Sequence, residues 1–121
     1  MSSKVSFEGI GEVMATFYAE NGVAAGQVVQ LSGDSTVGPC EAGERFFGAA
    51  VSVKDGYVGV QVEGFAQVTC KDTSVTAGYV ALTADGNGGV KKVSTASGST
   101  DVGNEYLVVA IHGDETITIK L

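Results

Sequence analysis

The stretch Tyr57-Val58-Gly59-Val60-Gln61-Val62-Glu63 places a valine at every second position. A repeat of two puts alternate side chains on opposite faces of an extended chain, so this stretch predicts a strand with one buried face. Ile117, Ile119 and Leu121 alternate with polar residues in the same way at the C-terminus. Just before the first stretch stands Asp55-Gly56, and an Asp-Gly pair between alternating runs is typical of a β-hairpin turn.

Six further segments predict strands because they are short and rich in Val, Thr or aromatic residues. They are residues 12–18, 27–31, 46–53, 65–70, 79–83 and 105–111. Only residues 13–19 also suggest a helix, and they are equally readable as a strand. We therefore expect one all-β domain over residues 1–121, a compact sandwich or partly open barrel of about eight to ten short strands.

The two halves of the chain resemble one another. Val23-Ala24-Ala25-Gly26-Gln27-Val28 aligns with Val75-Thr76-Ala77-Gly78-Tyr79-Val80, and residues 42–46 resemble residues 102–106. An apolar strand, a Gly/Asp turn and an alternating strand follow in each half. This pattern predicts two related β units in tandem, 23–70 and 75–121, preceded by an N-terminal strand region at 1–20.

The charge of the chain points to protein partners. Its 121 residues include 14 acidic and 7 basic ones, for a formal net charge of −7. A protein that binds nucleic acid or an anionic membrane needs clustered Lys and Arg, whereas this chain has a single arginine, Arg45, and scattered lysines. The N-terminus carries no apolar secretion signal, so we expect the protein in a cytoplasm.

Cys40 and Cys70 are then expected to be free thiols that behave as small buried hydrophobic residues. Whether they pair in a disulfide stays open. Neither cysteine has a Cys or His neighbour at metal-ligand spacing, and no cofactor-binding motif accompanies them.

The groups that catalysis needs are few, so we do not expect an enzyme. The one histidine, His112, lies in a Gly/Asp turn and is not accompanied by a Gly-x-Ser-x-Gly nucleophile motif. Two acidic pairs, Glu41 with Glu44 and Asp114 with Glu115, stand beside turns, where solvated carboxylates are usual.

Calcium is the one metal that the sequence suggests at all. Asp85 and Asn87 in the glycine-rich stretch 85–89 offer oxygen ligands on a flexible backbone. The stretch lacks the spacing and the final Glu of an EF-hand loop, so an ordinary hairpin turn is the favoured interpretation.

Phe46 and Phe47 are adjacent in a predicted strand, so one faces inward and the other outward. An outward Phe47 is a candidate interface residue. If both faces of the sheet are covered, both rings belong to the core, and the same choice applies to Phe17-Tyr18.

The order of these segments resembles that of small β-rich head decoration (cement) proteins of tailed bacteriophages. The stretches that carry the resemblance are residues 23–31, 43–53 and 57–70, with the C-terminal half as a looser second copy. The resemblance implies a non-enzymatic virion protein, assembled in the host cytoplasm, that coats the capsid exterior in many copies. It further implies binding to the major capsid protein, frequent trimers and no cofactor.

The N-terminal segment 2–7 has no hairpin partner, so we expect it to order on the capsid by adding to a sheet edge. Ser3, Val5 and Phe7 are therefore interface candidates. That the segment is an ordinary strand of its own domain is an equally open interpretation.

Two rival functions remain at this point. Glycine-rich β chains also suit a phage tail or fibre component. A bacterial carbohydrate- or peptide-binding β-sandwich is the other rival, although the chain has no Trp to stack on sugars.

Overall fold

The computed structural model describes residues 11–121, and every regular element within them is a β-strand. The all-β prediction is confirmed. The strands are β1 (Val13–Ala19), β2 (Val28–Gly33), β3 (Thr36–Pro39), β4 (Gly48–Lys54), β5 (Tyr57–Glu63), β6 (Phe65–Thr69), β7 (Gly78–Ala84), β8 (Val90–Lys92), β9 (Asn104–Ile111) and β10 (Thr116–Lys120).

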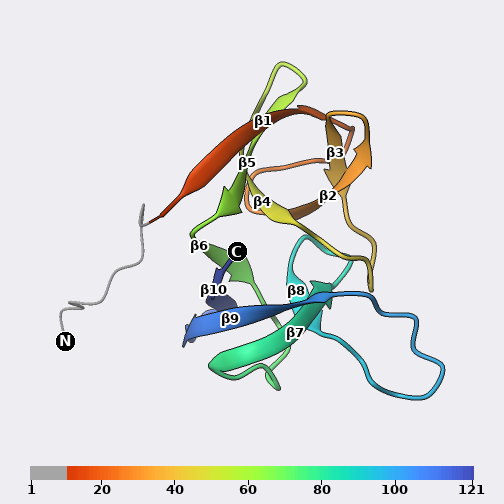
Figure 1. Cartoon of the computed structure of the whole chain (residues 1–121), viewed down its shortest axis with the longest axis vertical. Helices are drawn as coiled ribbons and strands as arrows, with labels where there is room; N and C mark the ends of the chain where they lie inside the picture. The colour runs from red at the N-terminus through yellow and green to blue at the C-terminus, as the bar shows by residue number, and fades with distance from the viewer. Residues whose placement is uncertain (1–10) are drawn as a thin grey trace.

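The first five strands close into a barrel in the order β1-β3-β2-β4-β5 (Figure 1). β5 completes the barrel by pairing antiparallel with β1, from Val13 opposite Glu63 to Tyr18 opposite Tyr57. The β4–β5 hairpin turns at Asp55 and Gly56, whose φ angles are 53° and 80°. Positive φ angles at both central residues are what a type I′ hairpin turn requires, so the Asp-Gly signal is confirmed.

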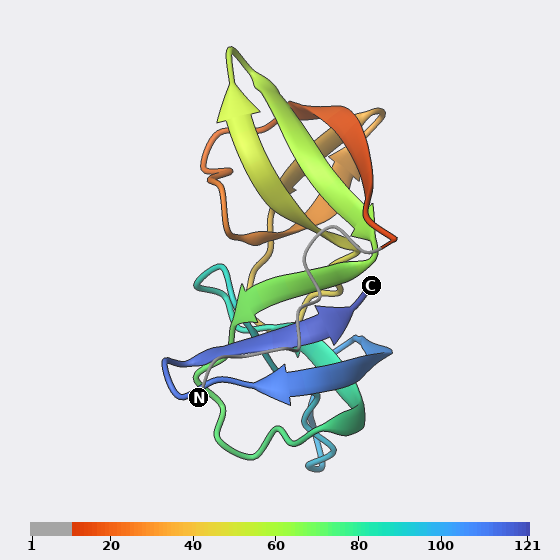
Figure 2. The same cartoon turned by 90° about the vertical axis from the view of Figure 1, so that its left-hand side faces the viewer.

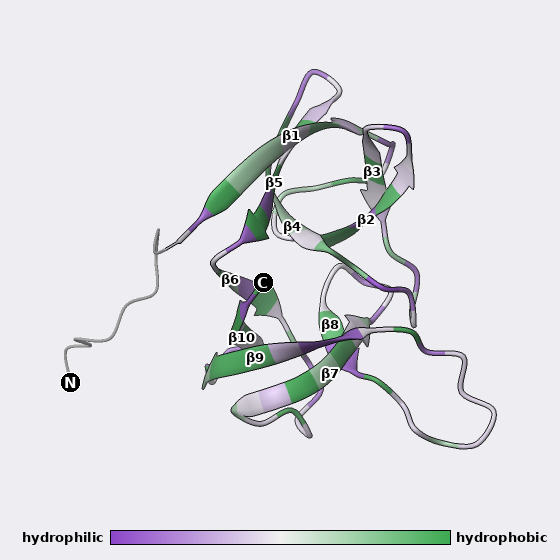
Figure 3. Cartoon of the chain, in the orientation of Figure 1, coloured by the Kyte–Doolittle hydropathy of each residue, from purple (hydrophilic) through white to green (hydrophobic). Residues whose placement is uncertain are grey.

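The other five strands form an antiparallel sheet in the order β6-β10-β9-β7-β8. Figure 2 shows this sheet stacked against one end of the barrel. Most strands contain hydrophobic stretches, whereas the tip of the β4–β5 hairpin is hydrophilic (Figure 3). Residues 11–121 contain no helix of the length and apolarity that crossing a membrane demands.

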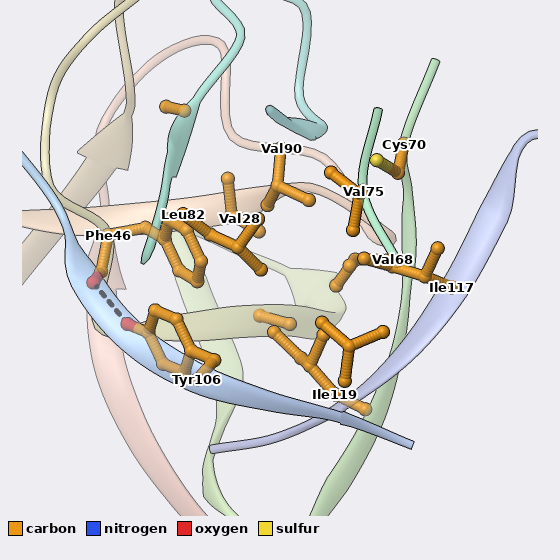
Figure 4. Close-up of a cluster of buried hydrophobic side chains, with 14 of the residues drawn as sticks. Val28, Phe46, Val68, Cys70, Val75, Leu82, Val90, Tyr106, Ile117 and Ile119 are labelled. Atoms are coloured by element: carbon orange, nitrogen blue, oxygen red, sulfur yellow. Dashed lines mark hydrogen bonds between the residues drawn. The ribbon is translucent and has the colours of Figure 1, made fainter. Parts of the chain in front are cut away.

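Two hydrophobic cores follow from this arrangement. The smaller fills the barrel and consists of Val29, Val37, Ala50, Val58 and Val60. The larger covers the inner face of the second sheet and includes Leu82, Val108, Ile117 and Ile119, together with Val28 and Phe46 from the first half of the chain (Figure 4). Because successive strand residues point to opposite faces, the neighbours Val28 and Val29 serve different cores. β2 is therefore shared between the barrel interior and the contact with the second sheet.

The two sheets meet at Gly64, so the sheets divide the chain at a different place from the predicted units 23–70 and 75–121. β6 was expected in the first unit, but it pairs along its whole length with β10 in the second sheet. β1, expected in a separate N-terminal region, is part of the barrel. Gly64 has a φ of 93°, a conformation in which glycine is strongly preferred, and this residue turns the chain from one sheet into the other. A repeat relationship between the two halves stays a prediction.

Candidate functional site

A groove opens on the barrel where β2 and β4 separate. Their pairing is limited to Val28 opposite Ala49 and Val29 opposite Gly48. Beyond this point β2 stays paired with β3 but diverges from the segment that leads into β4. The resulting groove has a volume of about 440 Å³ and is lined by Phe17, Gln30, Leu31, Arg45, Phe46 and Phe47.

The apolar walls of the groove are aromatic. The rings of Phe17 and Phe47 meet edge to face, with centroids 5.6 Å apart and an angle of 69° between their planes. Both rings also pack against the barrel core, so their orientation is fixed. Leu31 lies at the mouth and is 59% exposed, so most of its side chain is available to a partner.

The structure places Phe46 and Phe47 on opposite sides of the chain, as expected from their adjacency. Phe46 is buried in the larger core, whereas Phe47 is half-buried and lines the groove. Phe47 is therefore a core residue on one edge of its ring and a surface residue on the other.

Polar contacts fix one rim of the groove. The side-chain amide of Gln30 donates to Glu44 Oε1 at 2.8 Å and to the carbonyl oxygen of Pro39 at 3.2 Å. Glu44 Oε1 also accepts the backbone N–H of Glu41 at 2.7 Å. Glu44, considered above as half of an acidic pair, thus ties β2 to the loop before β4.

Among the described residues that line the groove, Arg45 is the one that carries a positive charge. Its side chain is exposed, and within residues 11–121 the one ion pair of the protein joins Lys91 to Asp101, elsewhere on the surface. A guanidinium presents paired N–H donors that match a carboxylate in two-point geometry. The groove therefore combines an apolar slot with an anion-binding group at its edge.

His112 and its acidic neighbours form a turn on the second sheet. Nε2 of His112 lies 2.9 Å from the hydroxyl oxygen of Thr118, so the described partner of the ring is a threonine and not a serine. The Thr116 hydroxyl donates to the Asp114 carboxylate, which lowers the pKa of Asp114. These contacts bind the turn to β10, and the turn's residues do not reach the barrel groove.

The stretch around Asp85 and Asn87 is held together by Asp85 itself. Asp85 Oδ1 accepts the backbone N–H of Asn87 at 2.7 Å and that of Gly89 at 3.0 Å. The carbonyl oxygen of Gly88 then accepts the N–H of Val28, which joins this loop to the barrel. In the described part of the chain no three His, Cys, Asp or Glu side chains gather as metal ligands do.

Cys40 and Cys70 are both buried free thiols in the larger core. Burial raises the pKa of Cys40 to about 11, and the nearby Glu44 carboxylate adds to the shift. A thiol that keeps its proton at neutral pH is a poor nucleophile and metal ligand. The expectation of two small buried hydrophobic residues is confirmed.

The remaining interface candidates, Ser3, Val5 and Phe7, lie outside the described residues. Sequence reasoning missed Gln30, Leu31 and Arg45 as groove residues. The sequence did offer a signal for Leu31. This leucine directly precedes a polar Ser-Gly-Asp turn, where its side chain is expected to be exposed. No protein-family model matches the chain, and a search of curated proteins finds no significant match.

Proposed function

We propose that this chain is a non-enzymatic structural protein of a phage head, which binds the outer capsid surface and stabilises the shell. The contact with the major capsid protein runs through the groove lined by Phe17, Leu31, Arg45 and Phe47. The observation that carries the proposal is the pairing of an aromatic slot with an exposed arginine on an otherwise acidic protein.

The groove fits a short polypeptide segment of the partner better than it fits a flat surface of the partner. Buried aromatic residues with an arginine beside them are the residue types that dominate binding energy in protein interfaces. An apolar side chain of the partner fills the slot between Leu31 and Phe47, and a carboxylate of the partner meets Arg45. Because the net charge is −7, acidic segments are repelled elsewhere, so Arg45 also sets where such a segment docks.

The fold presents the groove in a fixed shape. Phe17 and Phe47 are held by the barrel core, and Phe46 is held by the larger core beneath it. A partner therefore loses little free energy in ordering this surface. We further propose that a homotrimer engages several capsid subunits at once, since linked weak contacts bind far more tightly than each contact alone.

The test is co-sedimentation with heads assembled from the major capsid protein encoded in the same genome. We expect saturable binding of the wild type, and at least a tenfold loss of affinity in Leu31→Ser and Arg45→Ala. Val51→Ser and Lys71→Ala are matched controls, because both side chains are exposed and outside the groove. No saturable binding, or groove variants that bind like the controls, would overturn the proposal.

A ligand-binding β module is the second candidate, and one observation favours it. Tyr18 and Tyr57 face each other on the barrel surface with ring centroids 5.5 Å apart, and both are more than half exposed. Exposed aromatic rings offer flat apolar faces on which a planar or sugar-like ligand can stack. Titration with soluble oligosaccharides, followed by NMR at these two tyrosines, separates the candidates. Saturable chemical-shift changes favour the ligand-binding module, whereas unchanged shifts favour the head protein.

A further inference from the structure

The groove on the barrel exposes an open strand edge as well as aromatic side chains. β2 pairs with β4 only through Val28 and Val29, so residues 30–33 of β2 have no strand beside them on the groove side. The carbonyl oxygen of Val29 accepts the N–H of Phe47 at 3.1 Å and therefore faces β4. Because every second residue of a strand directs its backbone groups to the same neighbour, the backbone of Leu31 faces the groove.

The register of β3 gives the same direction for the Leu31 backbone. Val37 stands opposite Leu31, but its carbonyl oxygen accepts the N–H of Glu20 and so faces the end of β1. Leu31 and Val37 are thus a pair without hydrogen bonds between them. The N–H and the carbonyl oxygen of Leu31 point into the groove, and within residues 11–121 neither has a hydrogen-bond partner.

The edge of β8 is protected in a way that the edge of β2 is not. Just after β8, the N–H of Val93 donates to the carbonyl oxygen of Ala81 in β7, so the N–H of Lys92 points away from the sheet. The carboxylate of Asp72 covers this N–H, which Oδ2 accepts at 3.0 Å. Proteins commonly block free edges with charged side chains, because unpaired N–H and C=O groups are a template for a further strand. At Leu31 the edge stays open beside an aromatic slot.

We propose that the partner segment binds in this groove as an added β-strand, hydrogen-bonded to the backbone of Leu31. The inference rests on the capsid contact proposed above and specifies how that contact is made. Backbone hydrogen bonds hold the segment on the edge of β2, and pockets for its alternate side chains select its sequence, as in other cases of strand addition.

The groove selects an extended segment with an apolar and an acidic side chain. Side chains of an added strand alternate between two faces, so one of them points toward the barrel interior, where Phe17 and Phe47 form the apolar wall. The exposed guanidinium of Arg45 has no ion-pair partner among residues 11–121 and matches a carboxylate. The volume of about 440 Å³ lies within the range of about 300–1,000 Å³ that is usual for ligand sites.

The first experiment removes the N–H of Leu31 and keeps its side chain. Incorporation of the α-hydroxy acid analogue of leucine at this position turns the backbone amide into an ester. We expect the ester protein to bind assembled heads about three- to tenfold more weakly than the wild type, because one backbone hydrogen bond is lost. The corresponding ester at Thr95, in the exposed loop between β8 and β9, is the control and is expected to bind like the wild type. Melting temperatures check that both ester proteins fold.

Hydrogen exchange gives a second measurement on the unmodified protein. The N–H of Leu31 is expected to exchange rapidly in the free chain and about tenfold more slowly on decorated heads. The N–H of Gln30 points toward β3 and is the internal reference, whose rate is expected to stay the same. Protection of Leu31 in the free chain that grows with protein concentration would place a second copy on this edge and overturn the proposal.

The outcomes separate strand addition from the function on which it rests. The wild type may bind heads while the ester protein binds equally well, or while Leu31 stays unprotected on them. Either result shows that strand addition is wrong and leaves the head-binding proposal standing.

If the wild type does not bind heads, the proposed function fails and a synthetic peptide tests the edge alone. The probe is the acetylated and amidated peptide Thr-Val-Asp-Leu-Asp-Val-Thr, together with two versions that are N-methylated along one edge or the other. Saturable NMR shifts at the Leu31 amide that one of the two methylated versions abolishes would support strand addition. No shifts, or shifts that both versions retain, would overturn it.

Discussion

The hydroxyl of Tyr106 donates a hydrogen bond to the backbone carbonyl oxygen of Phe46 at 3.0 Å, and the two rings stack with their centroids 4.9 Å apart (Figure 4). Tyr106 stands on β9 of the second sheet, whereas Phe46 directly precedes the groove residue Phe47. The second sheet therefore holds the backbone that presents Arg45 and Phe47 to the barrel groove.

Replacing Tyr106 with Phe tests this link. The substitution keeps the ring but leaves a buried carbonyl without its side-chain donor, and we expect a loss of about 1–3 kcal/mol in the free energy of unfolding. Urea denaturation measures the loss. Tyr79→Phe is the control, because its hydroxyl is on the surface, and we expect a change within about 0.5 kcal/mol. Equal effects of the two substitutions would show that the Tyr106 bond is not structural.

Gly103 marks a close approach between β9 and β7. A Cβ at this position would overlap the backbone carbonyl oxygen of Leu82. Gly103→Ala must therefore push the start of β9 away from β7, and we expect it to cost about 1–3 kcal/mol, as other overpacked sites do. Gly113 has open space around its Cβ position, so Gly113→Ala is the matched control. We expect its free energy of unfolding to equal that of the wild type.

Stability should fall in alkaline solution because of Cys40. Burial raises the pKa of this thiol from 9.0 to about 11, so the unfolded chain loses the proton at lower pH than the folded one does. The contribution of this group is constant below pH 9 and is lost as the pH rises from about 9 to about 11. Burial also raises the pKa of Tyr106 above 10.0, which extends the decline.

Chemical denaturation across this pH range, with and without Cys40→Ala, measures the effect. The variant is expected to show a shallower decline between pH 9 and 11, with the remainder due to Tyr106 and other groups. Identical pH profiles for the two proteins would contradict the assignment to Cys40.

Asp85 is expected to stabilise its loop without a metal. Its carboxylate accepts two backbone N–H groups, so Asp85→Ala leaves both without a partner and should lower the melting temperature. Addition of EDTA or of millimolar calcium should leave the wild-type melting temperature unchanged. A rise with calcium that Asp85→Ala abolishes would restore the calcium interpretation.

Local pattern was enough to predict most of the strands. Eight of the ten strands match a predicted segment. Two of these segments, 57–63 and 116–120, were predicted from alternating apolar and polar residues, and the others from their content of Val, Thr and aromatic residues. β3 (Thr36–Pro39) and β8 (Val90–Lys92) were missed, because each is at most four residues long and β3 contains both Gly and Pro. Such short strands are set by their pairing partners, β2 and β7, more than by their own residues.

The pairing of strands that are distant in the sequence could not be predicted from local patterns. The pairing of β6 with β10 joins residues about fifty positions apart, and only this contact places the sheet boundary at Gly64. The groove was missed for a related reason. Leu31, Arg45 and Phe47 come together because β2 and β4 separate after two residue pairs, and no local pattern encodes that separation. Of the groove residues, only Phe47 was indicated by the sequence, through its adjacency to Phe46.

Site-specific photo-crosslinking on assembled heads tests the central claim most directly. With a photoreactive amino acid in place of Leu31, irradiation of decorated heads is expected to give one covalent adduct with the major capsid protein. The same probe at Thr95, which is exposed in the loop between β8 and β9, is expected to give none. An adduct from Thr95 but not from Leu31, or no adduct from either on heads that carry the protein, would contradict the assignment of the groove as the capsid contact.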